Sequence, residues 1–258
     1  MYPGTVCSIN TTQERTLLKP IAEAKIFSIQ VGLPKTINTD ETTDSTYRPW
    51  TTGFFKLPVD GRVWLGRDNL DGDGQADLHN HGGEDKAVNA YPHEHYAFWT
   101  ERLGLENLNT GAFGENFTLS GLIESDVCIG DIFEIGDARI QISQPRQPCW
   151  KLSRRWHVRD LALQVQNTGH TGWYFRVLHE GFVEAGMSLR LTERPHPQWT
   201  VTLANDIMHH HTSDFEAARS LMDCRSLASR WKTTLEKRIT TGTAGDNAAR
   251  LYGPDISL

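Results

Sequence analysis

The stretch GDIFEIGDARIQISQPRQPCWKL, residues 130–152, decides the fold. Within it, residues 138–143 alternate apolar and polar side chains, which is the period of a strand with one buried face. Gly136 and Asp137, directly before them, suit a tight hairpin turn that follows the apolar run at 132–135. Short strands that meet at glycine corners are typical of a β-barrel or a β-sandwich, so we expect a mainly β fold.

Further apolar segments predict the rest of this fold. Residues 25–33 also alternate as a strand does, and short strands are predicted at 63–65 and 182–191. Residues 91–104 have helical spacing with Pro92 at the first helical position, so we expect a helix that packs on the barrel. The buried face of the first strand is expected to consist of Phe27, Ile29, Val31 and Leu33.

The segment 36–52 has a different composition. It is rich in Thr and Asp and has almost no aliphatic residues, which predicts a mobile loop. Such a loop is interpreted either as a lid or as a solvated connection.

A domain boundary is predicted at RPHP, residues 194–197, because two prolines stop a strand and a helical period follows them. Apolar residues then recur every fourth position over 227–239. Ser226 is the candidate N-cap of this predicted helix and Gly242 its candidate end, within a small bundle of about three helices. The predicted organisation is an N-terminal extension at 1–24, a β-barrel domain at 25–196 and a C-terminal helical domain at 200–258.

Length and charge exclude several classes of protein. The 258 residues can bury a sizeable core without disulfides. The formal charge of −6, from 26 basic and 32 acidic residues, argues against a nucleic-acid partner. The sequence has neither a run of about 18 apolar residues nor the features of a secretory signal, so we expect a cytoplasmic protein without a membrane partner.

The four cysteines, Cys7, Cys128, Cys149 and Cys224, lie far apart in the sequence. Without a C-x-x-C pair they do not support a zinc ribbon, a redox dithiol or an iron–sulfur cluster. Cys128 and Cys224 are interpreted as small buried hydrophobic residues. Cys149 differs from them because its turn is rich in prolines and cations.

The turn around Cys149 has the features of a reactive thiolate. Arg146 and Lys151 flank the cysteine, and nearby cations favour the thiolate, which is both the nucleophile and the metal ligand. Pro145 and Pro148 leave the turn few accessible shapes, so the thiolate is held in one direction. For the arginines that follow, a solvated helix face is as good an explanation as a role near the thiolate. These arginines are Arg154, Arg155 and Arg159.

The segment HNHGGEDKAVNAYPHEHY, residues 79–96, holds a second group of polar residues. One interpretation is a zinc site, although no third ligand has a diagnostic position. The other is an anion-binding loop, in which the two glycines bring backbone N–H groups near a ligand while His81 and Lys86 add donors. The histidines considered for zinc are His79, His81, His93 and His95.

Two further motifs complete the set. GAFGENF, residues 111–117, also permits close approach of its backbone, and its Asn116 can both donate and accept hydrogen bonds. The three histidines at 209–211 are expected to face solvent, and we assign them no role.

Taken in order, six segments resemble a MOSC domain, the module named for the C-terminal part of molybdenum cofactor sulfurases. The resemblance covers roughly residues 25–195. The tail segment LASRWKTTLEKRI, residues 227–239, is also similar to the helical end of the YiiM-type branch. The six segments are GDGQAD (72–77), HGGEDKAVNAY (81–91), FGENF (113–117), GDIFEIG (130–136), QPRQPCWKL (144–152) and GWYFRV (172–177).

The resemblance implies a fold that is mainly β with α: a MOSC-like β-barrel with packed helices, plus a small C-terminal helical bundle. It also implies that the barrel binds the molybdenum cofactor, molybdenum held by molybdopterin, and that Cys149 is the metal ligand and the catalytic residue. Position in the matching segments makes five further residues candidates to line the cofactor site. They are His81, Asn116, Gln144, Arg146 and Lys151.

The resemblance further implies a molybdenum-dependent oxidoreductase that reduces small N-hydroxylated substrates, such as the base hydroxylaminopurine, to the amine. Ferredoxin-like cysteine spacing and a G-x-G-x-x-G motif are absent, so electrons are expected from a separate reductase. The resemblance favours a homodimer, and Trp199 and Trp231 either form its surface or pack the tail onto the barrel. The loop at 36–52 and the extra His79 depart from the family pattern and bear on substrate choice.

Two other functions stay open. A carrier or binding protein would hold the cofactor or sulfur at Cys149 without turnover. A cysteine-nucleophile hydrolase would need a base beside Cys149, for which His81 and His157 are the candidates.

Overall fold

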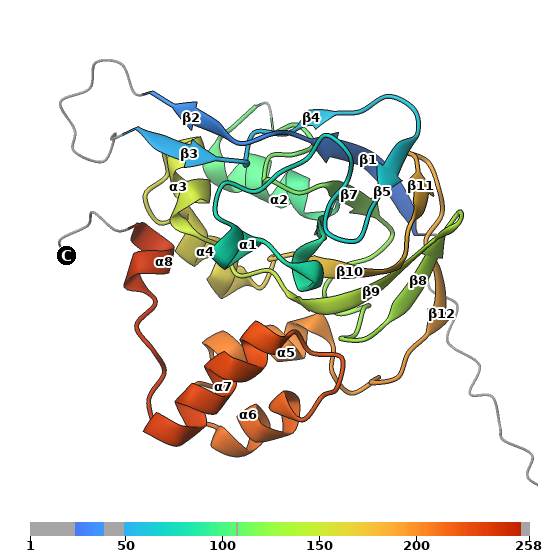
Figure 1. Ribbon diagram of the computed structural model, residues 1–258. Coiled ribbons are helices and arrows are strands. Elements are labelled where there is room, and N and C mark those ends of the chain that lie inside the picture. The colour runs from blue at the N-terminus through green and yellow to red at the C-terminus, as the bar shows by residue number, and fades with distance from the viewer. Residues whose placement is uncertain (1–23, 39–48, 107, 254–258) are drawn as a thin grey trace, which may run out of the picture.

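The computed structural model describes residues 24–38, 49–106 and 108–253. Its main element is a mixed sheet of eight strands that curls into half of a barrel (Figure 1). Neighbouring strands are antiparallel, except that β6 and β7 run parallel. In sheet order the strands are β12 (Arg190–Glu193), β8 (Ile132–Ile135), β9 (Ala138–Pro145), β10 (Trp173–His179), β6 (Val88–Pro92), β7 (Phe117–Ser120), β1 (Lys25–Val31) and β4 (Leu57–Pro58).

Two small antiparallel sheets and the helices complete the fold. In the first sheet β5 (Val63–Leu65) pairs with β11 (Gly181–Val183), and in the second β2 (Lys35–Ile37) pairs with β3 (Trp50–Thr52). None of the helices in the described ranges has the length and apolar character needed to span a bilayer. The helices are α1 (Leu78–His81), the 3-10 helix η2 (Glu84–Lys86), α2 (His95–Leu103), α3 (Trp150–Trp156), α4 (Leu161–Thr168), α5 (Val201–His209), α6 (Phe215–Met222), α7 (Ser229–Thr241) and α8 (Ala248–Tyr252).

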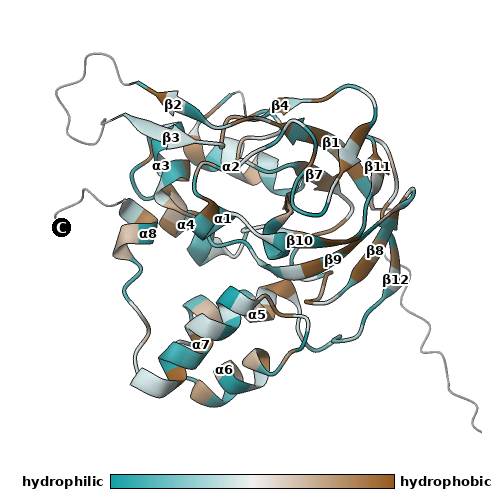
Figure 2. Cartoon of the chain, in the orientation of Figure 1, coloured by the Kyte–Doolittle hydropathy of each residue, from teal (hydrophilic) through white to brown (hydrophobic). Residues whose placement is uncertain are grey.

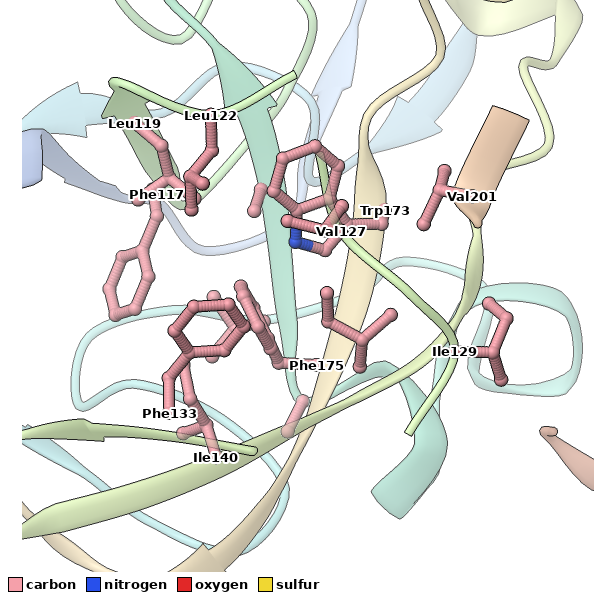
Figure 3. Packing of buried hydrophobic residues seen from close by; sticks show 14 of the residues in the cluster. Phe117, Leu119, Leu122, Val127, Ile129, Phe133, Ile140, Trp173, Phe175 and Val201 are labelled. Atoms are coloured by element: carbon pink, nitrogen blue, oxygen red, sulfur yellow. The ribbon is translucent and has the colours of Figure 1, made fainter. Parts of the chain in front are cut away.

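The hairpin predicted from the alternating residues is confirmed. β8 and β9 pair in antiparallel around Gly136, whose φ of 56° lies in the left-handed region that favours glycine. Ile140 of β9 is fully buried and packs near Phe133 and Phe175, whose rings meet edge to face at 6.0 Å (Figure 3). The apolar face of this hairpin therefore forms part of the main core.

β1 buries the predicted face only after Phe27: Ile29 is buried and Val31 packs against the core, as predicted. A β-bulge between Ile26 and Ser28 shifts its register against β7, so that Ile26 and Ile29 are both buried. Phe27 is 51% exposed, and Leu33, which lies beyond the strand, is 67% exposed. A bulge adds one residue and turns the following side chains to the other face. Since the bulge depends on the pairing with β7, strict alternation could not locate it.

Two predicted elements have different bounds in the structure. Pro92 ends β6 instead of beginning a helix, because it pairs with β7 opposite Leu119, and α2 begins only at His95. The segment 182–191 forms parts of two strands, β11 and β12, since the chain turns between them at Gly186, where φ is 91°.

The prediction of a loop at 36–52 is wrong at both ends of the segment. These ends pair with each other as β2 and β3, where two threonine hydroxyls share a hydrogen bond of 3.0 Å. Residues 39–48, to which the expected mobility also applied, lie outside the described residues. The same holds for Cys7 and for all of the predicted N-terminal extension except Ala24.

The C-terminal helices share the hydrophobic core of the sheet. Helices α5, α6 and α7 lie together, whereas α8 packs against α3 and α4 (Figure 1). Val201 of α5 is fully buried near Trp173 (Figure 3), and Trp231 of α7 is 1% exposed in the same cluster. Figure 2 shows strongly hydrophobic residues along β8 and β9 and mostly polar colours on the outer face of α7. Trp231 therefore packs the tail onto the sheet.

Details of the tail differ from the prediction. α7 begins after Ala228, so Ser226 is not its N-cap, while Gly242 ends the helix in the left-handed conformation, as predicted. His210 and His211 are exposed, as predicted, but the ring of His209 lies 6.4 Å from that of Trp231, and burial lowers the pKa of His209 to about 3. The buried positions predicted for two cysteines, Cys128 and Cys224, are confirmed.

The N-terminus of α7 is capped by a residue outside the helix. Asp85 of η2 accepts a hydrogen bond of 3.1 Å from the Ser229 N–H, and Ala228 offers no side-chain cap. The same carboxylate accepts a bond of 2.9 Å from Arg176 Nε on β10. A carboxylate at a helix N-terminus satisfies unpaired N–H groups and interacts favourably with the helix dipole. Asp85 thereby joins the C-terminal helices to the loop that carries His81.

Replacing Asp85 with alanine is expected to lower the free energy of unfolding by about 2 kcal/mol, because both bonds are lost. Urea denaturation followed by tryptophan fluorescence measures this change. Glu236→Ala, at an exposed position of α7, is the matched control and should change the free energy by less than about 0.5 kcal/mol. Equal losses of free energy of unfolding in the two variants would contradict the proposal that Asp85 caps α7.

Candidate functional site

Cys149 occupies the N-cap position of α3, with an extended backbone at φ −131° and ψ 164°. The Arg146 N–H donates to the Gly172 carbonyl at 3.0 Å, which anchors the chain as it leaves β9. The Cys149 carbonyl accepts the Leu152 N–H at 3.0 Å, which begins the helix. The thiol is thus held between the end of a strand and the start of a helix.

His81 is the last residue of α1, and its imidazole lies close enough to the Cys149 thiol to lower the pKa of that thiol through hydrogen bonding and charge. This short helix is capped by Asp77, which accepts the Asn80 N–H at 3.0 Å. Gly82 follows because a Cβ at that position would lie 2.8 Å from the Leu78 carbonyl oxygen. The histidine–glycine motif and the cysteine turn, far apart in the sequence, therefore meet in one thiol–imidazole pair.

The pair lies between two adjoining cavities that share lining residues: a smaller one of about 80 Å³, here called the inner cavity, and a larger one of about 680 Å³, called the outer cavity. Cys149, His81 and Lys151 line both cavities. Asn116 and Arg146 line the inner cavity, and Gln144 lines the outer one. The structure therefore brings all six candidate residues to one place, while their roles toward a ligand stay predictions.

The Cys149 thiol is easily ionised. Although burial raises its pKa, the hydrogen bond and charge of His81 and the charge of Arg146 outweigh burial and lower the pKa to about 7. The Lys151 N–H contributes as a backbone donor. The structure supports the thiolate inferred from the turn, with two differences: His81 is the main stabilising partner, and Lys151 acts through its main chain.

Alkylation of Cys149 by iodoacetamide in cofactor-free protein is expected to accelerate as the pH rises through about 7, because only the thiolate reacts. His81→Ala removes the largest effect that lowers the pKa, so the midpoint should move up toward about 8.5. Peptide mass spectrometry at a series of pH values measures both midpoints. His79→Ala, an exposed histidine on the same helix, should leave the midpoint unchanged. An unmoved midpoint in His81→Ala would show that the imidazole does not stabilise the thiolate.

Three buried polar atoms around the thiol have no hydrogen-bond partner among the described residues. They are Arg146 Nη1, Gln144 Oε1 and Asn89 Oδ1. The other groups of these side chains are engaged: Arg146 Nη2, for example, donates to the Phe113 carbonyl at 2.9 Å. A buried polar atom without a partner costs about 1–3 kcal/mol. Together the three atoms indicate that a polar ligand completes the site.

Asn116 has mainly a structural role. Its Nδ2 donates to the Gln30 carbonyl at 3.2 Å and to Asp73 Oδ2 at 2.9 Å, and its Oδ1 accepts the Asn89 N–H at 3.1 Å. Both amide hydrogens are occupied, so only a lone pair of Oδ1 can reach a ligand. Asp73 also pairs with Lys56, a buried cation of the inner cavity whose pKa is lowered by burial.

Several cavity residues were not singled out in the sequence because they come from distant segments. Tyr174 lies in the matching segment GWYFRV, which was its only signal. Lys86, expected only as a donor of the glycine loop, lines both cavities, and burial lowers its pKa to about 8. The others are Trp50, Lys56, Thr234, Arg230 and Arg250.

The remaining histidines of the second motif do not join His81. His95 instead contacts the buried Glu124 at 2.6 Å. Across the part of the chain that the structure describes, no group of three or more His, Cys, Asp or Glu side chains could hold a metal ion. The zinc interpretation of this motif therefore has no support in the described structure.

A curled mixed sheet, a thiolate cavity at the end of β9 and a helical C-terminal region together define the class of protein. Residues 77–190 match the MOSC domain, and residues 199–242 match the YiiM-like, 3-alpha helix domain. The chain belongs to the MOSC-domain family, in its YiiM-type branch, as its sequence segments predicted. MOSC domains are associated with binding of the molybdenum cofactor.

Individual relatives agree with this assignment. The chain is 44% identical to YflK of Bacillus subtilis (strain 168), over 83% of this chain and 93% of YflK. It is 40% identical to YiiM of Escherichia coli (strain K12), over 77% and 89% of the two chains. The crystal structure of YiiM from Geobacillus stearothermophilus superposes with a TM-score of 0.70 at 40% identity, over 84% of this chain and 99% of that chain. A protein of Gibberella moniliformis (strain M3125 / FGSC 7600) named reductase is 36% identical, over 58% of this chain and 27% of that protein.

Proposed function

We propose that the protein is a molybdenum cofactor-dependent reductase that converts N-hydroxylated bases and related compounds, such as hydroxylaminopurine, to amines. The observation that carries the proposal is the thiol of Cys149, which has a pKa of about 7 and lies between two cavities on the cysteine turn of a MOSC domain.

The residues around Cys149 fit the cofactor. A thiolate is a soft ligand suited to a metal that dithiolene sulfurs also hold. The unpaired atoms of Arg146, Gln144 and Asn89 offer one donor and two acceptors, which suits the mixed edge of a pterin. The cations of the outer cavity outnumber its two carboxylates and suit a phosphate group. These cations are Lys86, Lys151, Arg230 and Arg250.

The cofactor, when bound, supplies the two-electron chemistry that breaks the N–O bond. In the overall reaction, the substrate R–NHOH takes up two electrons and two protons and yields R–NH2 and water. Trp50 and Trp150 of the outer cavity, with ring centroids 5.6 Å apart, offer apolar faces that can orient a planar base. Lys86 Nζ, with a pKa of about 8, can donate a proton near neutral pH and take it up again.

Electrons come, in this proposal, from a separate reductase. The relative from Gibberella moniliformis bears the name reductase, which supports a reductive activity for the shared segment. The homodimer that the family resemblance favours and the cytoplasmic location expected from the sequence belong to the same proposal.

Metal analysis and turnover test the proposal together. Protein purified from a host that makes the cofactor should contain about one molybdenum per chain and, with a reduced viologen dye as donor, should convert hydroxylaminopurine to the aminopurine. Bound molybdenum without product would identify a carrier instead. Protein with neither molybdenum nor product would contradict the proposal.

The hydrogen bond between His81 and Cys149 favours a second candidate, a cysteine-nucleophile hydrolase, because it supplies the base that the sequence pattern did not locate. His157, the other candidate base, ends α3 at φ 55° and is not among the residues that line the two cavities. Molybdenum that shields Cys149 from alkylation would oppose this candidate. Hydrolysis of an activated ester by metal-free protein, lost on alkylation, would establish it.

A further inference from the structure

The C-terminal helices contact both segments that carry the thiol–imidazole pair. α7 contributes Arg230 and α8 contributes Arg250, and both arginines line the outer cavity. The match to the MOSC domain ends at residue 190 and the match to the three-helix domain ends at 242. α8, at 248–252, therefore lies beyond both family matches, although Figure 1 shows it beside α3.

Arg250 holds the turn of Cys149. Its Nη1 donates to the Pro148 carbonyl at 2.5 Å, and its Nη2 donates to Gln166 Oε1 on α4 at 2.6 Å. The Pro148 carbonyl belongs to the peptide plane that leads into Cys149, so this hydrogen bond fixes the orientation of that plane. Burial lowers the pKa of Arg250 to about 10, so the guanidinium stays charged at neutral pH.

The rest of α8 is packed firmly enough to support this contact. Leu251 is 6% exposed, and the Ala248 N–H donates to Asp246 Oδ1 at 2.7 Å at the start of the helix. Gly253 lies against the indole of Trp150, where an added Cβ would sit 3.4 Å from the ring. α8 is thus docked directly on the first residue of the helix that Cys149 begins.

Arg230 holds the helix of His81. Its Nη2 donates to Asn80 Oδ1 at 2.7 Å, and its Nη1 donates to the His79 carbonyl. Lys86 Nζ supports the same helix by donating to the Asn80 carbonyl at 2.6 Å. α1 has only four residues and no buried side chain, so it depends on such contacts for its position.

We propose that the C-terminal helices position the thiol–imidazole pair: Arg250 aligns the Cys149 turn and Arg230 aligns α1 with His81. Besides the charge that each offers to a phosphate in the outer cavity, both are positioning residues, since each holds the main chain or a neighbouring side chain of a segment that carries the pair. The inference rests on the proposed function only for the chemistry at Cys149, because the contacts themselves do not depend on a cofactor.

The test uses full-length, cofactor-free protein and measures alkylation of Cys149 by iodoacetamide at a pH of about 9.5, where the thiol is ionised in every variant. Changes in rate then report access to the sulfur and its orientation instead of its ionisation. We expect Arg250→Ala and Arg230→Ala each to raise the rate at least about threefold. Arg250→Lys keeps one donor for the Pro148 carbonyl and should stay within about twofold of the unchanged protein. Arg219→Ala, an exposed arginine of α6, is the matched control.

Molybdenum content of the same variants from a cofactor-making host is the second readout, and we expect at least a twofold loss for each alanine variant. Unchanged alkylation rates in both alanine variants, with only a lower melting temperature, would show that the arginines merely stabilise the fold and would overturn the inference. If the unchanged protein held no molybdenum, the proposed function would fail, while the alkylation rates would still decide the positioning roles.

Discussion

Alanine in place of Cys149 is expected to leave the protein without molybdenum and to lower the rate of hydroxylaminopurine reduction at least about a thousandfold. The reason is that no other described side chain of the two cavities offers a soft thiolate: Cys128 and Cys224 are buried elsewhere, and burial raises the pKa of each. Mass-spectrometric metal analysis and turnover with a chemical electron donor measure the two losses.

Cys149→Ser tests whether molybdenum is lost because the thiolate is missing or because the shape of the site has changed. The serine hydroxyl can still accept a hydrogen bond from His81, but it stays protonated near pH 7 and is a harder donor, so molybdenum should be lost as in the alanine variant. Cys224→Ala, at a buried cysteine remote from the cavities, should keep its molybdenum. Full molybdenum content in Cys149→Ala would refute the ligand assignment.

Methionine in place of Arg146 is expected to lower the molybdenum content at least about tenfold and to slow alkylation of Cys149 at pH 7. Arg146 is 5% exposed and its charge lowers the pKa of the thiol, so its loss raises that pKa and reduces the thiolate fraction. The substitution also removes Nη1, the buried donor that has no protein partner in the described residues. Metal analysis and the pH dependence of alkylation test the two effects separately.

Arg146→Lys and Arg159→Met complete this experiment. Lysine keeps the positive charge but loses the forked geometry, so it should restore the alkylation rate more fully than the molybdenum content. Arg159 is exposed and follows the same turn, and its replacement should change neither quantity. Normal molybdenum content in Arg146→Met would mean that the unpaired guanidinium nitrogen does not face the cofactor.

The parts of the fold that follow from short-range patterns could be predicted. The alternation of residues 138–143 places β9, and the glycine before it permits the hairpin, since both depend on neighbours in the chain. The burial of Ile26 in place of Phe27 could not be predicted, because the bulge in β1 arises from pairing with β7. Pro92 satisfies the rule for a helix start, yet its pairing with β7 makes it the end of a strand.

The candidate site also has a part that the sequence could predict and a part that it could not. Cys149 and Arg146 are neighbours in the sequence, so a charged, proline-rich turn already indicated a thiolate there. Their partner His81 was singled out for its glycines and as one of two candidate bases for Cys149, but the sequence did not establish its contact with the thiol. Arg230 lies in the tail segment that resembles the YiiM-type branch and Arg250 had no signal, because nothing in a polar tail helix marks which side chain will reach a distant turn.

The sequence by itself determined the hairpin, the stiff cysteine turn and the family, because these depend on the order and spacing of residues along the chain. Only the tertiary structure decided which partners surround the thiol. The imidazole of His81, the unpaired atoms of Asn89 and Gln144 and the two arginines of the tail come from separate elements. They converge because the sheet shares a hydrophobic core with α5, α6 and α7, while α8 packs against α3 and α4, and this packing sets the distances between them.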